Sequence, residues 1–215
     1  MRAGRSTSLA IALATAVAAS LAVSAHRRDE YLQAARLAVE PGRVELELDL
    51  TPGIAIADAT IADLDADRDG VLSEVEKRAY AHRVFGALVL ELDGVALRID
   101  REAMTFPDLN DFRRGEGTIQ LRAAAALARQ ADGDHHVSFR NANRPDGSVY
   151  LANALVPASN RVMITGQRRD PAQRELTIDF VLRAGPATSA PPWLLGALTG
   201  VAVLAALLMR PSRIA

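Results

Sequence analysis

The chain has 215 residues and a formal net charge of -1, with 49% hydrophobic and 24% charged residues, a balance typical of an ordinary globular protein. Its basic residues are scattered, and no basic stretch is interleaved with aromatic side chains, so the composition argues against a nucleic-acid-binding class. Cysteine is absent, which excludes disulfides, thiolate metal sites and a cysteine nucleophile.

The N-terminal residues 1–25 have the layout of a secretory signal peptide. Arg2 and Arg5 precede a mainly apolar run over residues 9–23, and small residues follow up to Ala25. The pattern predicts cleavage after Ala25, so that the mature chain begins at His26. An uncleaved anchor helix is the alternative interpretation.

Residues 26–184 are expected to form one extracytoplasmic domain. Hydrophobic and acidic residues alternate strictly over residues 44–50, which predicts a strand with one buried and one solvated face. We expect residues 31–39 to pair with this strand through a turn at Pro41-Gly42.

A second hairpin is predicted further along the chain. Apolar residues alternate over 88–92 and again over 95–99, and Asp93-Gly94 supplies a tight turn between the two runs. Five more short β-like runs follow, over residues 119–123, 137–140, 149–155, 162–165 and 176–182.

The spacing of these runs predicts a mainly β fold, namely an immunoglobulin-like β-sandwich with one helical insertion. One segment stays open between two interpretations. Residues 123–130 are rich in alanine and leucine, which favours a helix, and the periodicity there does not decide between helix and strand.

The helical insertion is predicted over residues 55–87, between two strands. Ala57, Ile61 and Leu64 fall on one helical face before an acidic segment. After that segment, one apolar stripe is formed by Leu72, Val75 and Ala79, and a neighbouring stripe by Tyr80, Val84 and Ala87. The pattern therefore indicates helix, loop, helix.

The C-terminal part of the chain is predicted to be a membrane anchor. A linker rich in Gly, Pro, Ser and Ala over residues 185–192 precedes an apolar run over residues 193–209. Arg210 and Arg213 favour a cytoplasmic tail over residues 210–215 under the positive-inside rule. The body of the protein then lies in the periplasm or outside the cell.

Three further interpretations concern the same segment. It can be a cleaved sorting signal or a buried core helix instead of a retained span. Gly196 and Gly200 form a GxxxG pair, a spacing that brings transmembrane helices together and predicts a weak homodimer.

The most informative stretch is the acidic segment between the two predicted helices. Asp65, Asp67 and Asp69 alternate with other residues, Gly70 permits a sharp turn, and Glu76 follows at a fixed distance. Calcium is a hard cation that takes six to eight oxygen ligands, and carboxylates at alternating positions can surround it where the chain turns.

This segment resembles the calcium-binding loop of an EF-hand, whose first, third, fifth, sixth, seventh, ninth and twelfth positions fall on Asp65, Asp67, Asp69, Gly70, Val71, Ser73 and Glu76. The resemblance implies one bound calcium ion, with a carbonyl ligand from Val71, a water held by Ser73 and two oxygens from Glu76. A degenerate loop kept as a structural turn is the alternative.

No second calcium-binding loop of this kind is found. The acidic residues at 108–111 do not form one, because the segment lacks the glycine and the terminal glutamate of the motif. Exported modules bind calcium with dissociation constants of about 10⁻⁴ to 10⁻³ M, so a stabilising role is favoured over a sensor role.

Shorter patches resemble exported bacterial proteins, some of which lie beside multi-pass nickel/cobalt permeases. The patches are residues 26–33, 148–151 and 154–157. They imply no mechanism, and this chain differs in having one expected span.

Two other functions are weighed against calcium binding. A mature N-terminal His26, with Asp132, Asp134, His135 and His136, forms an alternative copper or nickel site. The third hypothesis is an unrecognised hydrolase. Because the chain has no HExxH, GxSxG or phosphate-binding glycine loop, we expect no enzyme. His82 is expected to be exposed.

Overall fold

A computed structural model describes residues 30–185 of the chain. The predicted signal peptide, His26 and the predicted membrane span, with Gly196 and Gly200, lie outside the described residues. Within residues 30–185, no helix is both long enough and apolar enough to cross a membrane.

The described elements are mainly strands. In chain order they are β1 (Tyr31–Glu40), β2 (Arg43–Pro52), η1 (Ile54–Ile56), α2 (Ala57–Leu64), α3 (Glu74–Gly86), β3 (Leu88–Leu92), β4 (Val95–Ala96), β5 (Asp100–Thr105), α4 (Leu109–Arg114), β6 (Ile119–Ala126), β7 (Gly133–Asn141), β8 (Ser148–Ala154), β9 (Val162–Arg169) and β10 (Glu175–Leu182).

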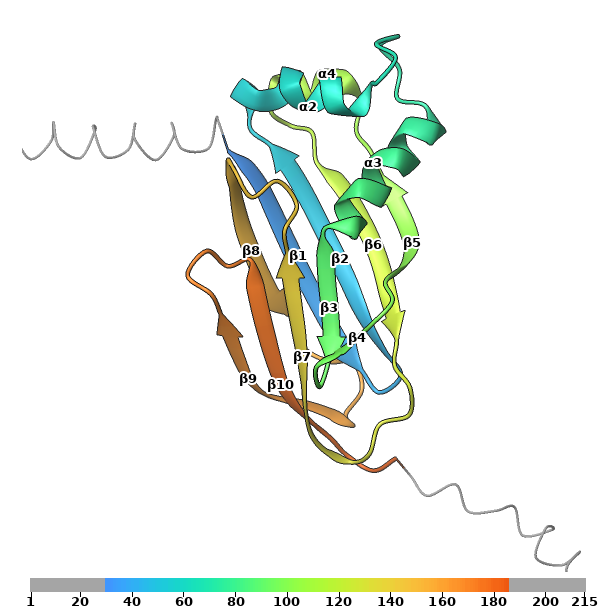
Figure 1. Ribbon diagram of the computed structural model, residues 1–215, viewed down its shortest axis with the longest axis vertical. Coiled ribbons are helices and arrows are strands. Elements are labelled where there is room, and N and C mark those ends of the chain that lie inside the picture. The colour runs from blue at the N-terminus through green and yellow to red at the C-terminus, as the bar shows by residue number, and fades with distance from the viewer. Residues whose placement is uncertain (1–29, 186–215) are drawn as a thin grey trace, which may run out of the picture. The chain divides into compact units, whose positions relative to one another are not determined.

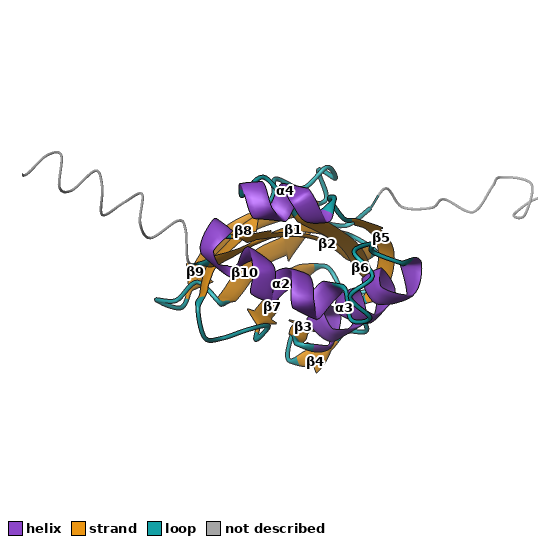
Figure 2. Cartoon of the chain, turned by 90° about the horizontal axis from the view of Figure 1, so that it is seen from above, coloured by secondary structure: helices purple, strands orange, loops and turns teal. Residues whose placement is uncertain are grey.

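The strands form two five-stranded sheets, which we call the two-sheet body. One sheet has the order β5-β6-β2-β1-β8 and the other β4-β3-β7-β10-β9. Seen from above in Figure 2, the sheets are stacked as two layers, and the helices lie over one end. The pairs are antiparallel except β1 with β8, which is parallel. The predicted mainly β architecture is confirmed.

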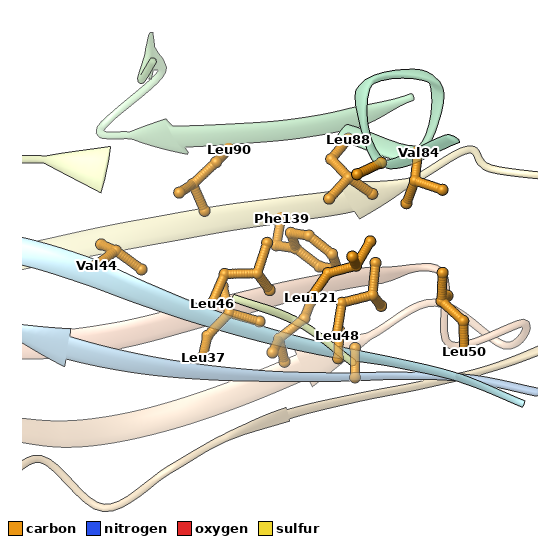
Figure 3. Packing of buried hydrophobic residues seen from close by; sticks show 14 of the residues in the cluster. Leu37, Val44, Leu46, Leu48, Leu50, Val84, Leu88, Leu90, Leu121 and Phe139 are labelled. Atoms are coloured by element: carbon orange, nitrogen blue, oxygen red, sulfur yellow. The ribbon is translucent and has the colours of Figure 1, made fainter. Parts of the chain in front are cut away.

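The core between the two sheets follows from the alternating pattern of the strands. On β1 and β2 every second residue is buried, because successive side chains of a strand point to opposite faces. Figure 3 shows Leu37, Leu46 and Leu48 of one sheet opposite Phe139 and Leu90 of the other. All five side chains belong to one buried cluster.

Both predicted hairpins are present, but the second is shorter than expected. Strand β1 pairs with β2 over their whole length. Strand β4 has only two residues, Val95 and Ala96, and pairs with the end of β3. Leu97 and Ile99 then lead to β5, which pairs with β6 in the other sheet.

The helical interpretation of residues 123–130 is wrong. Ala123–Ala126 continue strand β6, and Ala123 and Ala125 are opposite Leu46 and Val44 of β2. Both alanines are buried, so packing against the second sheet overrides the helix propensity of alanine.

The predicted helices α2 and α3 are present between β2 and β3, but the buried face of α3 is not the first stripe that the sequence indicates. Val75 is 74% exposed and Ala79 is also exposed, whereas Tyr80, Ala81 and Val84 are buried. Of the neighbouring stripe, Tyr80 and Val84 are therefore placed correctly.

A leucine-to-alanine pair on β1 tests the core. Leu37 is fully buried, and Leu32, on the opposite face of the same strand, is 37% exposed. We expect Leu37→Ala to lower the free energy of unfolding by about 2–5 kcal/mol, because it leaves a cavity, and Leu32→Ala by less than about 1 kcal/mol. Chemical denaturation measures both values, and equal losses would contradict this core.

Candidate metal centre

The acidic loop lies between α2 and α3, at the end of the body that the helices cover (Figure 1). Helix α2 buries Ala57, Thr60, Ile61 and Leu64, which fixes the point at which the loop begins. The Thr60 hydroxyl donates to the Ile56 carbonyl 3.0 Å away and so leaves no unpaired polar group beneath the helix.

The backbone of the loop turns sharply at two left-handed residues, Arg68 at φ 62° and Gly70 at φ 83°. Glycine adopts this conformation without the steric penalty of a Cβ atom. The turn directs several backbone N–H groups toward the carboxylates of the loop.

Asp65 is the buried acidic residue of the loop, with 5% of its surface exposed. One carboxylate oxygen accepts from the Asp69 N–H at 3.1 Å and the other from the Gly70 N–H at 3.0 Å. A carboxylate offers about four lone-pair sites, so both oxygens keep acceptor capacity for a cation.

Glu76 joins the two ends of the loop. One of its oxygens accepts from the Ala66 N–H at 2.7 Å, and the other accepts from the Ser73 N–H at 2.9 Å and the Ser73 hydroxyl at 2.8 Å. Ser73 is the N-cap of α3 and forms a capping box with Glu76. The hydrogen bonds from Ser73 lower the pKa of Glu76, which favours the carboxylate form.

The loop brings three of the predicted ligands together. Carboxylate oxygens of Asp65, Asp67 and Glu76 all lie within 4.8 Å of one another, and within residues 30–185 no other group of three or more acidic or histidine side chains does so.

The other predicted ligands are arranged differently. Asp69 is not part of this group, and one of its oxygens accepts from the Val71 N–H at 2.8 Å. Val71 is 65% exposed. The Ser73 hydroxyl donates a hydrogen bond to the Glu76 carboxylate and accepts one from the Glu76 N–H, so its position is fixed by Glu76.

No family model, curated protein or solved structure matches this chain.

Helix α3 is attached to the core through tyrosines. The hydroxyl of Tyr80 on α3 is hydrogen-bonded to the hydroxyl of Tyr31 on β1, and both side chains are buried. Burial is the main cause of a raised pKa for both hydroxyls, so both are neutral near pH 7.

The end of α2 is attached through Asp63. Its carboxylate forms an ion pair with Arg144, from the β7–β8 connection, and its carbonyl accepts from Arg83 of α3 at 2.9 Å. The Arg144 guanidinium also lies 5.1 Å from the centre of the Tyr31 ring. The sequence patterns did not indicate Tyr31 or Arg144, because both contacts join segments far apart in the chain.

The histidines of the alternative metal site have other partners. His135 Nδ1 lies 2.7 Å from the Asp93 carboxylate and Nε2 lies 2.8 Å from the Ala131 carbonyl, and His136 also faces Asp93, at 3.3 Å. Asp132 and Asp134 are not gathered with them into a metal-holding group. His82 is exposed, as predicted.

Two glycine-to-alanine variants test the loop backbone. An added Cβ meets no atom within 4 Å at Gly70 or at Gly86, but only Gly70 has a positive φ. Gly70→Ala should lower the free energy of unfolding by about 1–2 kcal/mol. Gly86→Ala, at the end of α3, should raise it by about 0.4–1 kcal/mol. Denaturation in the presence of a calcium chelator measures both, and effects of the same sign would contradict the loop conformation.

A pH dependence is expected from His135. Both ring nitrogens face acceptors, which only the imidazolium can satisfy, and the bonds to the Ala131 carbonyl and the Asp93 carboxylate raise its pKa in the folded state. The stabilisation is therefore fully present below the unfolded value of about 6.5 and is lost as pH rises through the raised folded pKa.

Denaturation curves recorded from below the unfolded pKa of about 6.5 to above the raised folded pKa check the expectation. The free energy of unfolding of His135→Gln should fall furthest below the wild-type value at acidic pH. The difference between the two free energies should shrink at alkaline pH. The same substitution at the exposed His82 serves as the control. A constant difference between wild type and His135→Gln at all pH values would show that the imidazolium contributes nothing.

Proposed function

We propose that the loop from Asp65 to Glu76 binds one calcium ion. The observation that carries the proposal is the approach of the Asp65, Asp67 and Glu76 oxygens to within 4.8 Å of one another in a loop with EF-hand spacing. Three carboxylates so close repel one another, and a divalent cation among them removes this repulsion.

Further ligands complete the oxygen sphere that calcium requires. In the proposal, Glu76 binds through both oxygens, Asp69 rotates away from the Val71 N–H toward the ion, the Val71 carbonyl is a ligand, and Ser73 holds a water. These roles follow from the EF-hand resemblance, since calcium takes six to eight oxygens at about 2.3–2.6 Å.

The bound ion acts as a structural clamp in this proposal. Asp65 follows the last residue of α2 and Glu76 lies in the first turn of α3. The two helices are attached to the two-sheet body at separate points, through Asp63 and through Tyr80. An ion between Asp65 and Glu76 joins them and stabilises the folded state.

The proposed setting is an exported protein that is anchored in the cytoplasmic membrane by residues 193–209, with the body in the periplasm or outside the cell. Calcium is not kept scarce there, so a dissociation constant of about 10⁻⁴ to 10⁻³ M is sufficient. The immunoglobulin-like assignment of the two-sheet body and the weak homodimer through Gly196 and Gly200 belong to the same proposal.

A glutamate-to-glutamine pair tests the metal centre. Glu76→Gln removes the charge but keeps a side chain that can form the capping box with Ser73. Glu74→Gln changes a carboxylate that lies in the same helical turn and bonds to Lys77. Calorimetric titration of the full-length chain should give one calcium per chain, with affinity lowered at least about tenfold by Glu76→Gln and unchanged by Glu74→Gln.

The clamp also predicts a gain in stability. Calcium at a hundredfold excess over its dissociation constant should raise the free energy of unfolding by about 2.7 kcal/mol, because the ion binds only the folded loop. Thermal melting with and without calcium measures the gain. If calcium binds but melting is unchanged, the clamp role is wrong; if no calcium is taken up at millimolar concentration, the metal centre itself is wrong.

A further inference from the structure

An apolar crevice of about 300 Å³ lies between α3 and β5, outside the acidic loop. Its apolar lining consists of Ala81 and Phe85 from α3 and of Ala103 and Met104 from β5. This volume is at the lower end of the range of small-molecule sites in proteins.

The crevice lies along β5, which is an irregular edge strand. It is the outermost strand of its sheet, and its pairing with β6 is shifted between Arg101 and Ala103. Phe85 and Met104 are only partly buried where they pack against the core. Apolar surface is therefore left open along this edge.

The same apolar surface continues past Phe85. A second hollow of about 350 Å³ is also lined by Phe85, together with Leu88, Leu97 and Ile99. No charged side chain lines this second hollow.

The charges around the crevice favour an anion. Arg78 and Arg101 line it, and within residues 30–185 neither guanidinium forms a side-chain hydrogen bond or a close ion pair. Arg78 interacts with the Glu74 carboxylate only as a nearby charge. The one acidic residue of the lining, Glu102, lies 3.9 Å from Arg43. Glu74, one turn before Arg78, is bonded to Lys77.

We infer that this crevice binds an amphipathic monoanion, that is, a carboxylate or sulfonate attached to an apolar body. The apolar body packs against Phe85 and Met104, and the anionic group accepts charge-assisted hydrogen bonds from Arg78 and Arg101. A guanidinium is suited to this role because its planar fork matches the geometry of a carboxylate. The site does not depend on calcium binding.

Photolabelling of the full-length chain with 4-azidobenzoate tests the inference, since this probe is a small aromatic carboxylate. The labelled residues are located by mass spectrometry, and unlabelled benzoate serves as competitor. The neutral analogue 4-azidobenzamide has the same ring without the charge. The double variant Arg78→Glu/Arg101→Glu reverses both charges, and Arg129→Glu reverses an exposed arginine outside the crevice lining.

We expect label in residues 74–86 and 100–105 that benzoate suppresses. The double variant and the neutral probe should each reduce this label at least about tenfold, and Arg129→Glu should not reduce it. Label that lies elsewhere in the chain, equal labelling by the neutral probe, or unchanged labelling of the double variant would each overturn the inference.

Discussion

The candidate metal centre depends on the carboxylate of Glu76, which joins the two ends of the acidic loop. Its oxygens accept hydrogen bonds from Ala66 at the start of the loop and from Ser73 at its end. The same side chain caps α3, so the position of the loop and the first turn of the helix are fixed by one group. Asp65 and Asp67 then lie close enough to share a cation with it.

The helices transmit this arrangement to the two-sheet body. Tyr80 connects α3 to β1, and Arg144 connects α2 to the β7–β8 connection. Helix α4 packs against α2, with an ion pair between Arg113 and Asp58 at 3.5 Å. In the proposed clamp, an ion in the loop joins the two helices that make these contacts with β1 and with the β7–β8 connection.

The strands of the two-sheet body are predictable from the sequence where one face of the strand is exposed to solvent and the other is buried. Residues 44–50 show this alternation clearly, whereas β5 begins with the charged run Asp100, Arg101 and Glu102 and is mostly exposed, so its pattern carries no such signal. The sequence analysis does not predict helix α4, because the helix has only six residues. It ends at Arg114, and its C-cap residue Gly115 has a φ of 73°.

The candidate site could be predicted in part, because some of its residues are close together in the sequence. The spacing of Asp65, Asp67 and Glu76 is local, and the loop brings these residues together as expected. The sequence pattern offered two apolar stripes on α3 and did not show which one is buried, because polar side chains surround much of the helix. The deciding contact, from Tyr80 to Tyr31, is 49 residues away in sequence. Long-range packing of this kind leaves no periodic signal.

The most direct test of the calcium proposal is a crystal structure of the chain grown in millimolar calcium. We expect one ion between α2 and α3, with oxygens of Asp65, Asp67 and Glu76 at about 2.3–2.6 Å from it. A loop that holds only water under these conditions, with the Glu76 hydrogen bonds to Ala66 and Ser73 unchanged, would contradict calcium binding and would identify the loop as a metal-free structural turn.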